Sequence, residues 1–140
     1  MSELTFEQYR KFVDNITSNE SKQYSSFLHR LAELEMSDGH INQNVNIPRL
    51  LTASLGMMSE GGEFGDIVKK ILFQGKEIDE DTKKHLKSEL SDICWYMVQA
   101  IKALDTSWEE IFDINIVKLS ERYPGGFDAL KSASRKVGDI

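Results

Sequence analysis

The stretch ELSDICWYM, residues 89–97, has the apolar spacing of a buried helix but places Glu89 and Asp92 on the face that should be apolar. At about 100° per residue, the two carboxylates lie on the same side of a helix as Ile93 and Tyr96. Burying an ionised carboxylate without a partner costs several kcal/mol even after the protein relaxes. The stretch therefore predicts a helix whose packed face carries acidic groups for a reason other than folding.

The segments on either side of this stretch read as long helices. Apolar residues recur every three or four positions from about residue 82 to residue 104, which predicts one helix there. Before it, Asn46 can cap a helix with Pro48 in its first turn, and Gly75 makes a plausible stop. After it, Thr106 and Glu109 form a capping-box pattern, which predicts a further helix to about Tyr123.

The ends of the chain are less regular. Residues 5–16 and 21–35 each look amphipathic and are separated by the polar TSNES, and residues 37–46 read as a loop. Residues 125–136 could form one short helix. An alternation of period two never persists, so we expect an all-α fold, a helical bundle with a four-helix core.

Length, composition and charge set further limits. The 140 residues fit one domain, residues 1–140, with a motif-bearing core at about residues 48–128. No apolar run approaches the roughly 20 residues that span a bilayer, and no signal layout is present, so we expect no membrane partner and a cytoplasmic location. A net charge of −6 argues against nucleic acid as a partner.

The single cysteine, Cys94, reads as a small buried hydrophobe.

A second acidic pair repeats the arrangement of the first. Glu60 and Glu63 are three residues apart within the apolar stripe of the preceding predicted helix. Spacing of i, i+3 puts two side chains about 5 to 6 Å apart at Cβ, close enough to converge on a metal ion. Carboxylate oxygens in this number are the preferred ligands of Mg²⁺, and Mn²⁺ accepts the same set. Either pair alone is more often a solvated helix face, and it is the presence of two pairs, both within apolar stripes of adjacent predicted helices, that favours a metal site.

Positive and amide side chains stand on neighbouring predicted helices. Asn115, Lys118 and Arg122 share a face with apolar residues of the last long helix, and Lys70 follows Glu63 by about two turns. Cations beside metal and carboxylates are what a triphosphate needs, because metal alone does not neutralise its charge. Taken singly, each cation also reads as a surface residue whose stem covers apolar neighbours.

Three motifs in order resemble one known family. EGGE at 60–63, ELSDICWYM at 89–97 and NIVKLSERYPGGF at 115–127 together resemble the MazG-like, all-α nucleoside triphosphate pyrophosphohydrolases, in their short single-domain form. Ser59 stands where the family's fuller EExxE motif has its first glutamate. The resemblance covers residues from about 50 to 128.

This resemblance implies an activity and a site. The implied reaction is hydrolysis of a nucleoside triphosphate to the monophosphate and pyrophosphate. Mg²⁺ would be bound by Glu60, Glu63, Glu89 and Asp92, and Asn115 and Lys118 would contact the nucleotide. Family members form homodimers or homotetramers, which would complete the bundle. We further expect one of the first pair to accept the proton of the attacking water, with Lys118, Lys70 and Arg122 steadying the phosphates.

Other classes of site fit less well. A di-iron bundle requires Glu-x-x-His pairs, and all three histidines follow Ser or Thr at that spacing. An EF-hand at DEDTKKHLKSEL lacks its glycine and final glutamate. Trp95 and Tyr96 read as base-stacking platforms or as core and interface residues. The remaining alternative is a non-enzymatic, dimeric helical module whose carboxylates form salt bridges with Lys70, Lys118 or Arg122.

Overall fold

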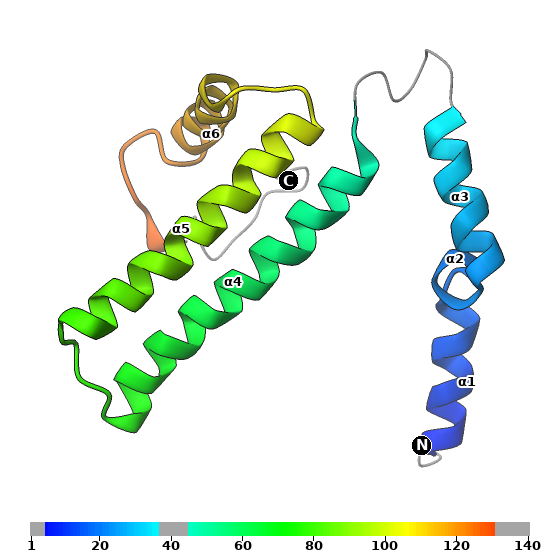
Figure 1. The fold of residues 1–140 in the computed structure, drawn as a ribbon, viewed down its shortest axis with the longest axis horizontal. Coiled ribbons are helices and arrows are strands. Elements are labelled where there is room, and N and C mark those ends of the chain that lie inside the picture. The colour runs from blue at the N-terminus through cyan, green and yellow to red at the C-terminus, as the bar shows by residue number, and fades with distance from the viewer. Residues whose placement is uncertain (1–4, 37–44, 131–140) are drawn as a thin grey trace. The chain divides into compact units, whose positions relative to one another are not determined.

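The computed structural model describes residues 5–36 and 45–130, and these residues form six α-helices (Figure 1). Within those two ranges no β-strand is present, apart from an isolated bridge between Pro124 and Gly126. The all-α class predicted from the sequence is confirmed. The chain divides into two compact units, residues 1–43 and 44–140. The motif-bearing core predicted at about residues 48–128 lies wholly in the second unit.

The first unit holds three helices, α1 (Phe6–Ile16), α2 (Asn19–Lys22) and α3 (Tyr24–Met36). Thr5 caps α1 in a reciprocal capping box. The Thr5 hydroxyl oxygen accepts from the Gln8 backbone amide, and the Gln8 side-chain oxygen accepts from the Thr5 backbone amide. The two amphipathic segments predicted here are therefore helical. The loop expected at residues 37–46 lies mostly outside the described residues.

The second unit is built on α4 (Ile47–Gln74) and α5 (Glu80–Ala103). Asn46 caps α4 by accepting from the Arg49 backbone amide at 2.9 Å, and Pro48 lies in the first turn. Gly75 ends the helix with φ at 69°, a left-handed conformation that glycine adopts without steric cost. All three signals predicted from the sequence are confirmed. Helix α5 begins slightly earlier than expected because Asp79 caps it by accepting from the Thr82 amide.

Helices α4 and α5 pack against each other along their length (Figure 1). Ala53, Ile67 and Ala103 are buried, and Gly56 of α4 lies directly against the Tyr96 ring of α5. The missing side chain at Gly56 therefore lets the two backbones approach closely. This close approach fixes the face on which the acidic residues of both helices meet.

Helix α6 (Trp108–Arg122) begins one residue later than the sequence pattern predicts. Ser107 is the cap and accepts from the Glu110 amide at 3.2 Å, while Thr106 donates its hydroxyl to the Glu110 carboxylate at 2.5 Å. The prediction of a Thr106 and Glu109 capping box was wrong because Ser107, one position on, offers an equally good acceptor. The short helix expected at residues 125–136 falls mostly outside the described residues.

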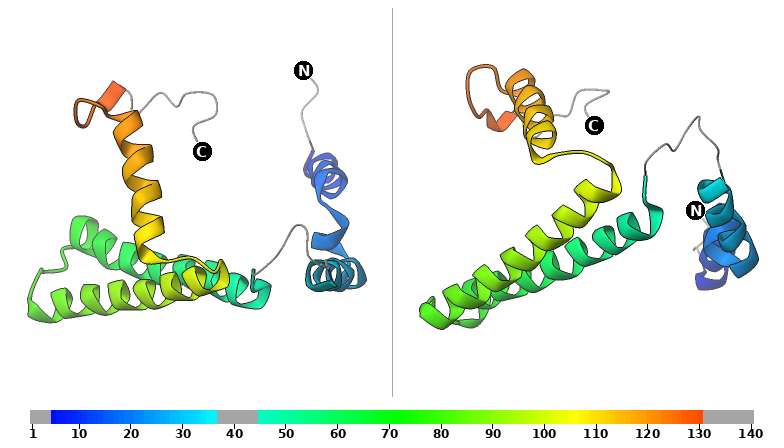
Figure 2. Two further views of the ribbon diagram at one scale, coloured as in Figure 1. Left: turned by 90° about the horizontal axis from the view of Figure 1, so that it is seen from above. Right: turned by 45° about the horizontal axis from the view of Figure 1, so that its top comes forward.

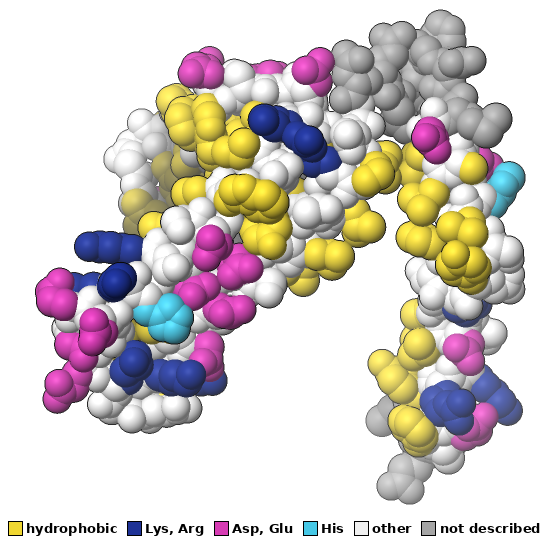
Figure 3. Space-filling model, in the orientation of Figure 1, with side chains coloured by type: hydrophobic (Ala, Val, Ile, Leu, Met, Phe, Trp, Pro, Cys, Tyr) yellow, Lys and Arg dark blue, Asp and Glu magenta, His cyan; other side chains and the backbone are white. Residues whose placement is uncertain are grey.

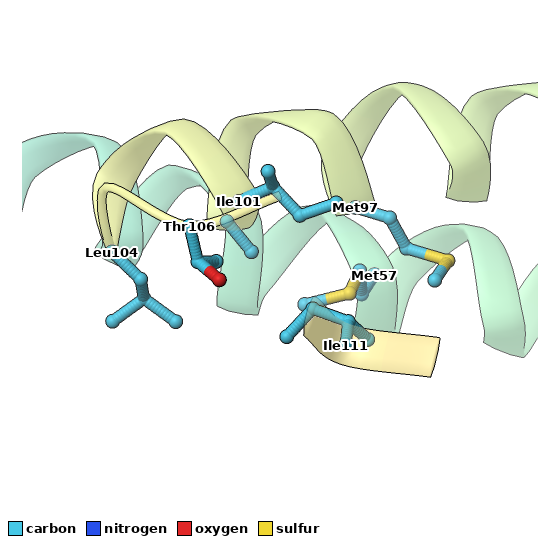
Figure 4. Close-up of a pocket in the computed structure, with 7 residues that line it drawn as sticks. Met57, Met97, Ile101, Leu104, Thr106 and Ile111 are labelled. Carbon is cyan, nitrogen blue, oxygen red and sulfur yellow. The ribbon is translucent and has the colours of Figure 1, made fainter. Parts of the chain in front are cut away.

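The α4–α5 pair forms a helical hairpin. The start of α6 contacts this hairpin at a small apolar cavity of about 140 Å³. It is lined by Met57, Met97, Ala100, Ile101, Leu104, Thr106 and Ile111, which come from α4, α5, the connection between α5 and α6, and the beginning of α6 (Figure 4). Beyond this joint, α6 stands away from the α4–α5 pair (Figure 2). Among the described residues, every helix is too short or too polar to cross a bilayer.

Candidate metal centre

Three predicted acidic residues converge where α4 and α5 face each other. Carboxylate oxygens of Glu60, Glu63 and Glu89 all lie within 4.8 Å of one another. Acidic side chains gather on this face of the hairpin (Figure 3). The three groups are separated by up to 29 positions in the sequence, so only the pairing of the helices brings them together. We call this set the carboxylate cluster.

The helices give the members of the carboxylate cluster different exposures. Glu89 is almost fully buried, with 6% of its surface exposed, Glu60 is half-buried and Glu63 is exposed. Glu60 follows the Gly56 and Tyr96 contact by one turn of α4, so this tight contact lies beside the cluster. The arrangement runs from a buried carboxylate to one at the surface, which leaves the cluster open to solvent on one side.

Asp92 lies beside the cluster. Its side chain is exposed, and its oxygens do not belong to the group that lies within 4.8 Å. It is nevertheless close enough for its charge to raise the pKa of Glu60. The structure thus brings three of the four predicted carboxylates together and leaves Asp92 as a near neighbour.

The electrostatics of the cluster show its mutual repulsion. The pKa of Glu60 is raised above 4.5, chiefly because the carboxylate has lost contact with solvent. Repulsion from the Glu63 charge, a hydrogen bond shared with Glu89 and repulsion from Asp92 raise it further, in that order. Every neighbour that shifts this pKa is acidic. A divalent cation relieves such repulsion, and a set of oxygen donors alone suits a hard ion such as Mg²⁺ or Mn²⁺.

The raised pKa of Glu60 predicts how the stability of the metal-free protein depends on pH. Because the folded state binds this proton more tightly than the unfolded state, the stabilisation from protonated Glu60 is complete below pH 4.5 and is lost as pH rises through the raised pKa. Replacing Glu60 by glutamine removes this loss. In thermal melts with chelator, we expect the Tm advantage of Glu60→Gln over the unmodified protein to grow from pH 4.5 towards neutrality. A constant difference would contradict the repulsion described above.

His85 is a neighbour of the cluster that the sequence analysis passed over. Its Nε2 lies 3.0 Å from Oε1 of Glu89, one turn along α5. The lack of a Glu-x-x-His spacing in the sequence excludes a di-iron site but not a contact between His85 and Glu89. The signal that would have found this contact is the i, i+4 spacing of His85 and Glu89, which puts the two side chains on one face.

The predicted phosphate-binding residues come from two helices, Lys70 from α4 and the other three from α6. Lys70 forms an ion pair with Asp66 at 2.6 Å, and hydrogen bonds from Lys69 and Lys70 lower the pKa of Asp66 to about 2. Asn115 and Lys118 are exposed on α6, which stands away from the hairpin (Figure 2). The guanidinium of Arg122 lies 5.4 Å from the centre of the Tyr123 ring. Their roles at a phosphate group stay predictions.

Two further expectations for α5 are resolved by the packing. Cys94 is exposed, so its prediction as a buried hydrophobe was wrong: its position on α5 faces away from α4. Tyr96 packs against Gly56, as a core residue would, whereas the Trp95 side chain is 54% exposed and meets Tyr96 edge to face.

Comparison with known proteins identifies a phage relative. The chain is 32% identical over 83 residues to the "Gene 37 protein" of Mycobacterium phage L5, a match covering 58% of this chain and 72% of the phage protein. No solved structure matches the chain significantly.

The family is identified by a match that spans all three motifs. Residues 50–127 match the model of the MazG nucleotide pyrophosphohydrolase domain, more than half of the chain. That range contains the carboxylate cluster, Asp92 and the whole of α6. The chain therefore belongs to the MazG nucleotide pyrophosphohydrolase family.

Proposed function

We propose that this protein hydrolyses nucleoside triphosphates, of the ribose or deoxyribose series, to the monophosphate and pyrophosphate, with Mg²⁺ as cofactor and Mn²⁺ able to replace it. The observation that supports this most strongly is the convergence of Glu60, Glu63 and Glu89 from two helices inside the segment that matches the family. A bound divalent ion would polarise phosphoryl oxygens and lower the pKa of a coordinated water.

The carboxylates are assigned different roles, metal ligation or proton acceptance, according to their burial. Glu89, buried and held by neighbours, is suited to act as a fixed ligand, and Glu60, Glu63 and Asp92 supply further oxygens. We assign acceptance of the proton of the attacking water to Glu60, a carboxylate of α4 on the half-buried side of the cluster. Glu63, at the exposed side of the cluster, is the second candidate for that step.

Substrate phosphates need positive partners in addition to the cofactor, since a triphosphate carries more charge than one divalent ion neutralises. We assign this role to Lys70, Lys118 and Arg122, with Asn115 contacting the nucleotide. Lys70 extends from the same helix as Glu60 and Glu63, two turns later.

The other three belong to α6, whose apolar residues Phe112, Ile114, Ile116 and Val117 are each 55–60% exposed. Surfaces of this kind favour association. We therefore propose a homodimer or homotetramer in which α6 packs against another copy and completes the bundle.

The non-enzymatic alternative is a helical interaction module in which the same carboxylates pair with cations. Among the described residues, Lys70 forms an ion pair with Asp66, and His85 pairs with Glu89. Lys70 is thus engaged by a carboxylate outside the cluster, which weakens this alternative. The two functions differ in whether metal and nucleotide bind.

Product analysis tests the proposed reaction. A panel of ribo- and deoxynucleoside triphosphates is incubated with the protein and Mg²⁺, and the products are identified by ³¹P NMR. We expect monophosphate and pyrophosphate in equal amounts, with no product when chelator replaces Mg²⁺. Formation of diphosphate and orthophosphate would contradict the proposed bond cleavage. Absence of hydrolysis, together with a Tm unmoved by metal and nucleotide, would favour the interaction module.

A further inference from the structure

His85 is placed to control the buried carboxylate of the cluster. Its Nε2 lies 3.0 Å from Oε1 of Glu89, within the contact distance of an ion pair. The Glu89 side chain is 8% exposed, whereas that of His85 is 56% exposed. The imidazole thus reaches from the surface of α5 to one oxygen of a buried carboxylate.

Glu89 needs such a contact because two other acidic groups share its surroundings. Its carboxylate also shares a hydrogen bond with Glu60, and Glu63 lies within 4.8 Å. The terminal torsion of a glutamate is intrinsically broad, so neighbours decide how the carboxylate plane is turned. The imidazole in contact with Oε1 limits how far that plane can turn.

We propose that His85 is a positioning residue for metal binding, which holds Oε1 of Glu89 through Nε2 and thereby directs Oε2 into the carboxylate cluster. This inference rests on the proposed function. Partners that orient ligating carboxylates affect metal affinity by about 10- to 100-fold when removed.

The chain offers a matched control. His29 and Glu33 on α3 have the same i, i+4 spacing, with Nε2 3.3 Å from Oε1. Their side chains are 76% and 49% exposed, and they lie outside the segment that matches the family. A general effect of removing a helical histidine and glutamate pair would therefore appear at His29 as well.

The test measures Mn²⁺ affinity of the full chain from the electron paramagnetic resonance signal of free Mn²⁺. We expect His85→Ala to weaken binding about 10-fold or more, and His29→Ala to leave it unchanged. His85→Gln should restore most of the affinity, because the glutamine amide nitrogen occupies nearly the position of Nε2. Hydrolysis by His85→Ala should require more Mg²⁺ for half-maximal rate yet approach the unmodified rate at saturating Mg²⁺.

Several results would overturn the positioning role. Unchanged Mn²⁺ affinity in His85→Ala would do so, as would a glutamine variant as weak as the alanine variant. Direct imidazole coordination, detected as ¹⁴N coupling to bound Mn²⁺ in the unmodified protein, would make His85 a ligand instead. If the unmodified protein bound no Mn²⁺, the proposed function would fail first and the role of His85 with it.

Discussion

Replacing Glu89 by glutamine is expected to lower pyrophosphate release by about 100-fold or more. The substitution keeps the shape of the side chain but removes the charge of the one buried carboxylate in the cluster. A divalent ion contributes several kcal/mol to stabilising charge in a phosphoryl-transfer transition state, and each 1.36 kcal/mol is about tenfold in rate. The measurement is the initial rate of pyrophosphate formation at a fixed Mg²⁺ concentration. The metal-free variant should stay folded and melt at or above the temperature of the unmodified protein, because a source of repulsion has been removed.

The matched control for this variant is Glu80→Gln on the same helix. Glu80 lies in the first turn of α5, where its side chain is 86% exposed and pairs with Lys83. Surface pairs of this kind contribute little to stability. We expect its hydrolysis rate to match that of the unmodified protein. Equal losses in both variants, or full activity in Glu89→Gln, would show that the buried carboxylate has no part in the reaction.

Substituting Gly56 by alanine is expected to destabilise the fold by about 1–3 kcal/mol, the range for overpacking of a tight contact. A Cβ at this position would overlap the Tyr96 ring, so α4 and α5 must separate or the ring must move. Glu60 follows one turn later on α4, so the same shift should draw it away from Glu89 and weaken metal binding. Urea denaturation and Mn²⁺ titration of the variant measure the two effects.

Gly65→Ala provides the comparison on the same helix. A Cβ at Gly65 meets nothing within 4 Å. Because alanine is the better helix former, we expect this variant to be more stable than the unmodified protein by up to about 1 kcal/mol. If Gly56→Ala proved as stable as Gly65→Ala, the close approach of the two helices would not govern the geometry of the cluster.

The sequence predicted the features of the fold that depend on near neighbours in the chain. Asn46, Pro48 and Gly75 delimit α4 through bonds and dihedral angles within a few residues, and each was confirmed. The wrong cap predicted for α6 has a related cause, because two neighbouring residues offer the same local signal. Thr106 and Ser107 are both good caps, and only the final turn geometry decides between them.

Features that depend on contacts between helices were predicted only in part. The i, i+3 spacing placed Glu60 and Glu63 on one face of α4, and that prediction extended correctly to a cluster with Glu89. It did not reveal that Asp92 lies at the edge of the cluster, or that Gly56 admits the Tyr96 ring. Spacing gives the angle of a residue around its own helix, whereas the depth of burial is set by the partner helix.

The most direct test of the account is whether the carboxylate cluster binds a divalent ion. Mn²⁺ is titrated into the metal-free protein and the free ion is measured by electron paramagnetic resonance, for the unmodified chain and for a variant carrying Glu60→Gln and Glu89→Gln. The account predicts saturable binding that Mg²⁺ displaces and that the double variant loses while remaining helical. Binding of equal strength in both proteins, or none in the unmodified protein at millimolar Mn²⁺, would contradict it.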